Sequence, residues 1–231
     1  MKRYCVFDMD GTLLDSMGYW RGLAVDYLRS RGIEPTAAEL APLRSQTMSQ
    51  SAEYFMELYG IPGPPRKIVD DMETVMDRHY REDIPLKPGA AEYLAALSRA
   101  GARLCVATAT AEYLARACLE RLDVLRYFEF VISCETINIG KDQPDIFYLA
   151  ARRLGASPGE TAVFEDAPYA AETAKAAGFF VVGLYDEASK SRQDRLAAVC
   201  DLYYTDLAQA LKDEAGSQLE ESAADKGGNN P

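Results

Sequence analysis

Short apolar runs alternating with amphipathic helical segments are the feature that most restricts how this chain can fold. Five runs rich in Val, Ile, Phe, Tyr and Cys predict buried strands, and a sixth run is weaker. In chain order these runs are Tyr4–Phe7, Arg103–Ala107, Phe128–Ser133, Thr161–Phe164, Phe179–Leu184 and, as the weakest, Asp201–Tyr204. Continuous apolar strands separated by helices are typical of a parallel sheet with helices on both faces, which predicts an α/β protein.

The segment between the first and second predicted strands breaks this alternation. From Met17 to about Asp83 the sequence carries only helical signals, separated by turns. We expect residues 17–83 to form an inserted α-helical domain, and residues 1–16 with 84–211 to form the core. The remaining residues, 212–231, are polar and acidic, so we expect a disordered tail.

The formal net charge of −11 over 231 residues bears on the partners of the protein. A diffuse negative field repels DNA and RNA, so we expect no nucleic-acid partner. The apolar stretches are too short to span a bilayer and the first ends at Asp8, so neither a membrane span nor a signal peptide is expected. The five cysteines are scattered without zinc-ligand spacing, as in a cytoplasmic protein with reduced thiols.

Two carboxylates, Asp8 and Asp10, follow the first predicted strand directly. In open parallel sheets, ligands bind at the carboxyl ends of the strands. Residues i and i+2 of a strand share a face, and Gly11 lets the chain turn after them. Two carboxylates this close repel each other, which favours protonation of one unless a cation intervenes. The pair therefore suits a nucleophile beside a general acid, although an aspartate pair can also simply cap a loop.

A second acidic pair, Glu165 and Asp166, follows the fourth predicted strand. Hard oxygen ligands from separate strands suit Mg²⁺, which binds one or two carboxylates together with phosphate. Taken alone, such a pair often only caps the following helix. Together with Asp8 and Asp10 it predicts a magnesium site at one edge of the sheet.

Two further segments supply groups that suit a phosphate. Lys141 lies in a loop just before a helix that Pro144 helps to start, and it can neutralise Asp8 and a bound phosphate. Thr108 and Ala109 follow the second predicted strand, where a hydroxyl and backbone N–H groups can bind an anion. Threonines are common at strand ends and loop lysines are usually solvated, so these segments gain weight only beside the acidic pairs.

The chain has a single histidine, His79. Serine–histidine triads and most zinc hydrolases need a well-placed histidine. His79 lies in the charged helical stretch Met76–Arg81, so we expect it on the surface rather than in a catalytic site.

In their order and setting, these motifs resemble those of the haloacid dehalogenase-like superfamily. The shared pattern consists of Asp8-x-Asp10-Gly-Thr, then Thr108, then Lys141 with Pro144-Asp145, then Glu165-Asp166. The closest resemblance is to the β-phosphoglucomutase-like and phosphoglycolate phosphatase-like subfamily, and it extends from Lys2 to about Leu211. It implies a Rossmann-like three-layer core, an α-helical cap after the first strand, and Mg²⁺ as cofactor.

The resemblance also implies catalytic roles. Asp8 would be the nucleophile and Asp10 the general acid and base, while Thr108 and Lys141 hold the phosphoryl group. The reaction would be the hydrolysis of a small-molecule phosphate monoester through an aspartyl-phosphate, with the cap closing over the site. We expect the protein to be a monomer or a weak dimer.

A set of metal ligands follows from the same resemblance. Asp8, the backbone carbonyl of Asp10, and Asp166 would hold the metal. Glu165 would bind it directly or through water.

Two departures from the family pattern favour hydrolysis over the alternative, a phosphosugar mutase of the β-phosphoglucomutase type. Trp20 stands where those mutases carry a histidine, and Ala111 where they carry a lysine for a distal phosphate. The lack of that lysine also favours a substrate with one phosphate. In the cap, Trp20 could pack on a ring or apolar face of the substrate, and Arg44 could meet an anionic or sugar group. The alternative is that Trp20 is cap core and Arg44 a solvated surface charge.

Two other interpretations keep the same kind of sheet. A receiver-type signalling module combines acidic strand ends with a Thr and a Lys, but its phosphoaccepting Asp lies on a middle strand and no helical domain follows it. A catalytically weak scaffold protein could retain the fold, but the complete set of motifs argues against it. The substrate is not readable from core motifs that are all committed to phosphate and metal.

Overall fold

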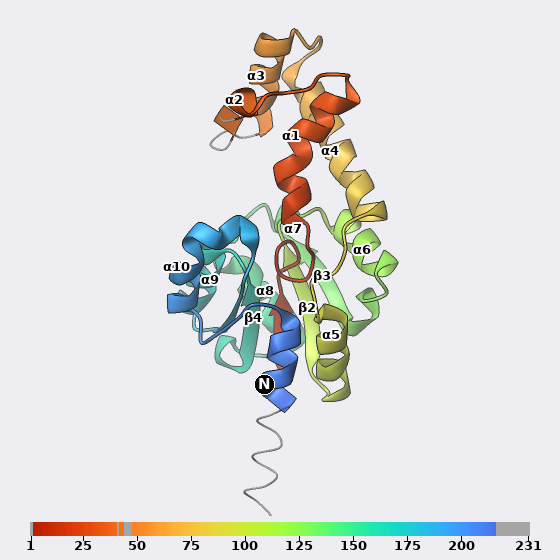
Figure 1. Ribbon diagram of the computed structural model, residues 1–231. Coiled ribbons are helices and arrows are strands. Elements are labelled where there is room, and N and C mark those ends of the chain that lie inside the picture. Colours follow the sequence, from red (N-terminus) through yellow and green to blue (C-terminus); the bar gives the residue numbers. More distant parts are fainter. Residues whose placement is uncertain (1, 41, 44–47, 216–231) are drawn as a thin grey trace, which may run out of the picture. The chain divides into compact units, whose positions relative to one another are not determined.

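The computed structural model describes residues 2–40, 42–43 and 48–215, and it divides into two compact units (Figure 1). The first, here called the core unit, comprises the chain up to Met17 and again from Pro85 onward. The second, the helical unit, comprises Gly18–Ile84. Among the described residues, no helix is both long and apolar enough to cross a membrane.

The core unit is built on a six-stranded parallel sheet with the strand order β3-β2-β1-β4-β5-β6. The strands are β1 (Tyr4–Phe7), β2 (Arg103–Thr108), β3 (Phe128–Ser133), β4 (Thr161–Glu165), β5 (Phe180–Leu184) and β6 (Leu202–Tyr204). All six predicted strands are confirmed, and no strand end differs from the prediction by more than one residue. The parallel α/β fold predicted from the alternating pattern is therefore confirmed.

Helices cover both faces of this sheet (Figure 1). The longer helices of the core unit are α5 (Ala90–Arg99), α6 (Glu112–Arg121), α8 (Asp145–Leu154), α9 (Pro168–Ala176) and α10 (Gln193–Val199). The short ones are α7 (Cys134–Ile137), η2 (Leu125–Tyr127), η3 (Pro158–Glu160) and η4 (Glu187–Arg192). Helices α8, α9 and α10 pack on one face over a continuous apolar cluster, and α5 and α6 lie on the other. With both faces covered, the central strands carry apolar residues at successive positions, which is why they read as continuous apolar runs.

The register of the central strands brings two strand ends to the same level. Phe7 of β1 pairs with Val106 of β2 on one side and with Phe164 of β4 on the other. Strands β2 and β3 lie to one side of β1, whereas β4, β5 and β6 lie to the other, so the strand order reverses between β1 and β4. Such a reversal point is where open α/β sheets bind ligands, and here the two acidic pairs follow the two strands that flank it.

The C-terminal part of the described chain corrects one expectation. Residues 207–215 are helical, so the tail predicted to begin at 212 starts too early. Leu207 and Ala210 are fully buried, and the hydroxyl of buried Tyr93 donates to Glu214 Oε1 at 2.7 Å. Glu214 accepts a hydrogen bond from a buried donor and therefore belongs to the fold, although the segment around it has the acidic composition of a tail. Of the predicted tail, residues 216–231 lie outside the described residues.

The helical unit contains α1 (Met17–Ser30), α2 (Ala37–Leu40), α3 (Met48–Tyr59) and α4 (Pro65–Glu82). The rings of Tyr27 on α1 and Phe55 on α3 stack with centroids 6.1 Å apart, and both side chains are buried. The described residues of this unit form helices and no strands, in agreement with the helical signals of the sequence.

His79 in this unit is a second correction, because it is buried rather than on the surface, with 7% of it exposed. It follows Met76 by three positions and precedes Tyr80 on α4, so helical periodicity turns it toward the apolar face of that helix. Its Nδ1 lies 2.7 Å from Asp83 Oδ2, and its ring lies 4.9 Å from that of Tyr19. The charged neighbours that suggested a surface position belong to the opposite face of the helix.

All five cysteines are free thiols, and four of them are buried. Burial raises the pKa of the Cys5 and Cys200 thiols to about 12, which makes both poor nucleophiles. The cysteines therefore act as small apolar packing residues and take no part in the site described below.

Candidate active site

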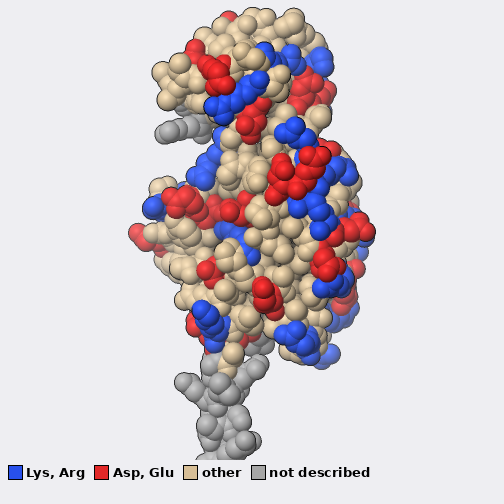
Figure 2. Space-filling view, turned by 45° about the vertical axis from the view of Figure 1, so that its right-hand side comes forward, with Lys and Arg blue, Asp and Glu red and all other residues tan. Residues whose placement is uncertain are grey.

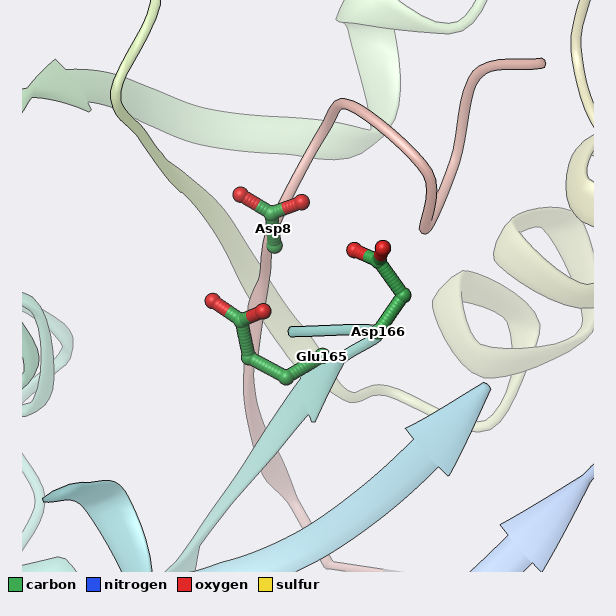
Figure 3. Close-up of side chains that lie close together, drawn as sticks. All are labelled: Asp8, Glu165 and Asp166. Atoms are coloured by element: carbon green, nitrogen blue, oxygen red, sulfur yellow. The ribbon is translucent and has the colours of Figure 1, made fainter. Parts of the chain in front are cut away.

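Three carboxyl groups meet where β1 and β4 end (Figure 3). Asp8 follows the last residue of β1, and its backbone N–H donates to Phe164 O at 2.9 Å, which extends the pairing of the two strands. Glu165 ends β4 and Asp166 follows it. One oxygen from each of the three carboxylates lies within 4.8 Å of the other two. The exposed fractions of Asp8, Glu165 and Asp166 are only 8%, 1% and 4%, so the cluster is shielded from solvent.

Lys141 supplies a positive charge to this cluster. It lies in the loop between α7 and α8, and only 4% of it is exposed. Its Nζ donates to Asp8 Oδ1 and, at 2.7 Å, to Glu165 Oε1. Burial alone would lower the pKa of the ammonium, but the charges of Asp8 and Glu165 outweigh that effect and hold the pKa above its ordinary value. Lys141 is therefore a permanently charged partner of two carboxylates.

The cluster contains more negative than positive charge, because three buried carboxylates face one ammonium. Burial raises the pKa of Glu165 to about 7, against the opposing effect of Lys141. The pKa of Asp166 lies well above its ordinary value because of burial and then because of the charges of Asp8 and Glu165. A divalent cation between the carboxylates would remove this repulsion and keep all of them ionised.

The loop after β1 is shaped to hold Asp166 close. Gly11 has a φ of +87°, and a Cβ at this position would lie 2.4 Å from Asp166 Oδ2, so only glycine fits. The hydroxyl of Thr12 donates to Asp166 Oδ1 at 3.1 Å. Three convergent, buried oxygen donors fit Mg²⁺, which takes hard oxygen ligands and keeps part of its water shell. Among the described residues the side chain of Asp10 is not part of this set, which leaves its carbonyl as the ligand that the sequence suggested.

The second side of the site is formed where β2 ends. Thr108 is fully buried, and its hydroxyl oxygen accepts the backbone N–H of Thr110 at 3.0 Å. The hydroxyl of Thr110 donates to Asp10 Oδ2 at 2.7 Å. Ala109, between the two threonines, is exposed. Asp10, predicted as acid and base, is thus joined to the predicted phosphate-binding segment through Thr110, a residue to which the sequence gave no role of its own.

A second buried ion pair near the cluster was also missed. Lys87 Nζ lies 2.8 Å from Asp186 Oδ2 and donates to Tyr185 O at 2.7 Å, and both charged side chains are almost fully buried. The charge of Asp186 raises the pKa of Asp166, whereas that of Lys87 lowers it, so the pair contributes to the electrostatic field at the three carboxylates. The only local signal was a lysine directly before Pro88, at a helix start where a basic side chain is unfavourable.

Two residues of the helical unit, Trp20 and Arg44, were predicted to contact the leaving group. Trp20 lies on α1, where its indole N–H donates to Tyr80 Oη at 3.1 Å, within the helical unit. This contact supports a packing role, and substrate binding by Trp20 stays a prediction. Arg44 lies outside the described residues.

A surface depression of about 510 Å³ is lined in part by the residues that follow Thr110 in the sequence. Its lining residues are Ala111, Glu112, Tyr113, Arg116, Glu135 and Thr136. Tyr113 is 63% exposed, and Arg116 lies 4.0 Å from Glu112, so the lining combines an open ring with charged and hydroxyl groups.

This arrangement agrees with comparisons to known proteins. A model of the haloacid dehalogenase-like hydrolase family matches residues 2–178, which is most of the chain. The chain belongs to this family. The resemblance predicted from the order of the motifs is confirmed.

Curated relatives of this hydrolase are named as phosphatases. The fructose-1-phosphate phosphatase YqaB of Escherichia coli is 27% identical over 184 residues, which cover 78% of this chain and 96% of the relative. Hexitol phosphatase A of the same species is 29% identical over 200 residues, covering 84% of this chain and 88% of the relative. A crystal structure of a candidate β-phosphoglucomutase from Thermotoga maritima superposes with a TM-score of 0.79 at 24% identity, covering 92% and 99% of the two chains. That match shows a common fold.

Proposed function

We propose that this hydrolase splits small-molecule phosphate monoesters in a magnesium-dependent reaction, through an aspartyl-phosphate formed on Asp8. The observation that carries the proposal is the buried group of three carboxylates and one lysine at the reversal point of the sheet. Relatives named as phosphatases, in a family of hydrolases, support a phosphoric monoester hydrolase.

In the proposed first step, a carboxylate oxygen of Asp8 attacks phosphorus while the bond from phosphorus to the ester oxygen breaks. Asp10 gives its proton to the departing alkoxide, so an alcohol leaves. In the second step, Asp10 takes a proton from a water, which attacks phosphorus and breaks the bond to Asp8. Inorganic phosphate is released, and both carboxylates return to their starting states.

Charge balance at the phosphoryl group would come from residues already in place. Lys141 stays cationic beside Asp8 and can approach a phosphoryl oxygen. The hydroxyl oxygen of Thr108 accepts from Thr110, so the hydroxyl hydrogen of Thr108 can be donated to the phosphoryl group. Asp8, Asp166, Glu165 and the carbonyl of Asp10 would hold Mg²⁺, which would neutralise phosphoryl charge when bound.

The depression beside the phosphate-binding segment suggests the kind of leaving group. It lacks the lysine that a distal phosphate would require at Ala111, and it carries Glu112 and Glu135. Carboxylates there disfavour a second phosphate, while Tyr113 and the polar groups suit a ring or a chain of hydroxyls. The proposed substrates are therefore sugar or sugar-alcohol monophosphates, in line with the relatives that are named as fructose-1-phosphate and hexitol phosphatases. The alternative, a phosphosugar mutase of the same fold, is not better supported, because the relatives named above are phosphatases and Ala111 replaces the lysine for a distal phosphate.

The decisive test measures phosphate release from a panel of sugar, sugar-alcohol and aryl monophosphates, with Mg²⁺ and with excess chelator. We expect activity with Mg²⁺, none with chelator, and poor replacement by Ca²⁺ because its larger coordination shell misplaces the phosphate. Asp8→Asn should lower turnover by roughly 10⁴-fold or more. Asp70→Asn, an exposed aspartate paired with Arg66 in the helical unit, is the matched control and should leave turnover unchanged.

Full activity in excess chelator would rule out the metal, and near-normal turnover by Asp8→Asn would rule out the nucleophile. Trapping the phosphoenzyme with a fast-hydrolysed ester and mass spectrometry of the Asp8 peptide separates an aspartyl-phosphate from direct attack by water. An absence of the adduct under those conditions would favour direct attack.

A further inference from the structure

Thr110 makes two contacts that join the two sides of the site. It lies two residues beyond the end of β2, and its backbone N–H donates to Thr108 Oγ1 at 3.0 Å. Its own hydroxyl donates to Asp10 Oδ2 at 2.7 Å, across 100 positions of the sequence. One residue thus touches both the threonine placed for the phosphoryl group and the carboxylate placed for proton transfer.

The loop after β1 constrains the backbone of Asp10. Gly11 N–H donates to Leu14 O at 3.0 Å, and a bridge joins Asp10 to Leu14, so the loop closes on itself. The Asp10 carboxylate extends from this loop and is partly exposed. A hydroxyl that donates to one oxygen of a carboxylate restricts the directions in which the group can point.

Thr110 is suited to this orienting contact because its own geometry is constrained. Its backbone is tied to the Thr108 hydroxyl, and a β-branched side chain has a strongly restricted χ1. The direction of its hydroxyl is therefore set by β2, the strand that pairs with β1. Any displacement of the β2 end would move the Thr108 hydroxyl and the Asp10 carboxylate together.

We infer that Thr110 is a positioning residue. It orients the Asp10 carboxylate toward the leaving-group oxygen and holds that carboxylate at a fixed position relative to Thr108. The inference rests on the proposed phosphatase activity and assigns no contact between Thr110 and substrate. Its consequence is selective: loss of the hydroxyl impairs proton delivery to the departing oxygen more than it impairs attack by Asp8.

The test uses three aryl phosphates whose phenols run from strongly to weakly acidic: 2,4-dinitrophenyl, 4-nitrophenyl and phenyl phosphate. A strongly acidic phenol leaves without a proton, whereas phenol itself needs one, so the ratio of kcat/KM for phenyl and dinitrophenyl phosphate reports proton delivery. The variants are Thr110→Val, Thr110→Ala and Thr110→Ser. The matched control is Thr173→Val on α9, which loses a hydroxyl that donates to the carbonyl of Tyr169 in its own helix.

We expect Thr110→Val and Thr110→Ala to lower this ratio by roughly tenfold, which is a fraction of the rate enhancement that a general acid contributes. Thr110→Ser keeps the hydroxyl and should return the ratio close to that of the wild type, and Thr173→Val should not change it. In an Asp10→Asn background, Thr110→Val should produce no further change in the ratio, because the group that it orients can no longer deliver a proton.

Equal losses on all three esters, or a drop in the ratio that persists in the Asp10→Asn background, would overturn the positioning role. Thermal unfolding of each variant shows whether a uniform loss comes from misfolding. If it does, the test relies on Thr110→Ser, which retains the hydroxyl, and on its ratio of kcat/KM for phenyl and dinitrophenyl phosphate. If the wild-type protein released phosphate from the aryl esters but Thr110→Val behaved as wild type, only this inference would fail. If the wild-type protein released phosphate from no ester, the proposed function itself would fail as well.

Discussion

The carboxylate cluster at the edge of the core sheet and helix α4 of the helical unit contain the same types of charged residue. They differ in how deeply these residues are buried and in how many partners of opposite charge each has. At the edge, Asp8, Lys141, Glu165 and Asp166 are each at most 8% exposed, and one ammonium serves several carboxylates. On α4, the pair Arg66–Asp70 lies one turn apart with mostly exposed side chains, and the pair Arg81–Asp77, also one turn apart, is partly exposed. On the face that Figure 2 presents, Lys and Arg side chains likewise lie among Asp and Glu side chains.

The exposed charges on α4 keep the protein soluble, whereas the buried charges at the strand ends are suited to binding and catalysis. Exposed pairs one helical turn apart contribute little, because water already solvates both partners. Buried charges without a full set of partners are unfavourable, and a fold keeps them where a ligand or a metal completes the set. The following experiments test this contrast, beginning with the largest expected effect.

Removing the ammonium should separate the two regions most clearly. Lys141→Met leaves Asp8 and Glu165 without their buried cation, and should cost about 3–5 kcal/mol of unfolding free energy in the absence of metal. Turnover should fall at least roughly 100-fold, because Lys141 supplies the positive charge proposed to face the phosphoryl group. Arg66→Met on α4 should change the unfolding free energy by less than about 0.5 kcal/mol. Urea unfolding and phosphate release measure both, and equal effects of the two substitutions would refute the contrast.

Two glycines with the same backbone requirement provide a finer comparison. Gly11 and Gly32 both have positive φ, +87° and +77°, but a Cβ at Gly32 meets no atom within 4 Å, whereas one at Gly11 would overlap the carboxylate of Asp166. Gly32→Ala should therefore cost only the conformational penalty of about 1–2 kcal/mol. Gly11→Ala should cost more and, in addition, displace Asp166, a proposed metal ligand.

The measurement is the rise in melting temperature on addition of Mg²⁺. It should persist in Gly32→Ala and shrink or vanish in Gly11→Ala. A full Mg²⁺ response in Gly11→Ala would show that Asp166 binds the cation from another position or does not bind it.

The smallest effect concerns the C-terminal helix of the core unit. Truncation after Lys212 removes Glu214, the acceptor for the buried hydroxyl of Tyr93, and should cost about 1–3 kcal/mol. Truncation after Ala215 retains this hydrogen bond and is the control. Chemical denaturation compares the two, while turnover at low temperature should be similar because Tyr93 is not part of the acidic cluster. Identical stabilities would mean that water satisfies Tyr93 without cost.

Much of the fold followed from local pattern, because periodicity reports the energy of burying neighbouring side chains. The run Val6-Phe7 and the run Val163-Phe164 are apolar at every position, since strands inside a covered parallel sheet bury both faces. The same logic failed at His79, where the charged side chains of one face of α4 masked the buried position of the other. It failed again at Glu214, where one long-range hydrogen bond outweighed an acidic composition.

The sequence by itself determined the order of strands and helices along the chain and the residue types that lie at each strand end. It also carried the family pattern of Asp8, Asp10, Lys141, Glu165 and Asp166, because the types and order of these residues are written along the chain. Only the tertiary structure decided which of them touch. Lys141 reaches Asp8 across 133 positions, and Thr110 reaches Asp10 across 100, through crossovers and strand register that no local window contains. The physical reason is that burial patterns record an average environment, whereas a hydrogen bond depends on the positions of two particular atoms.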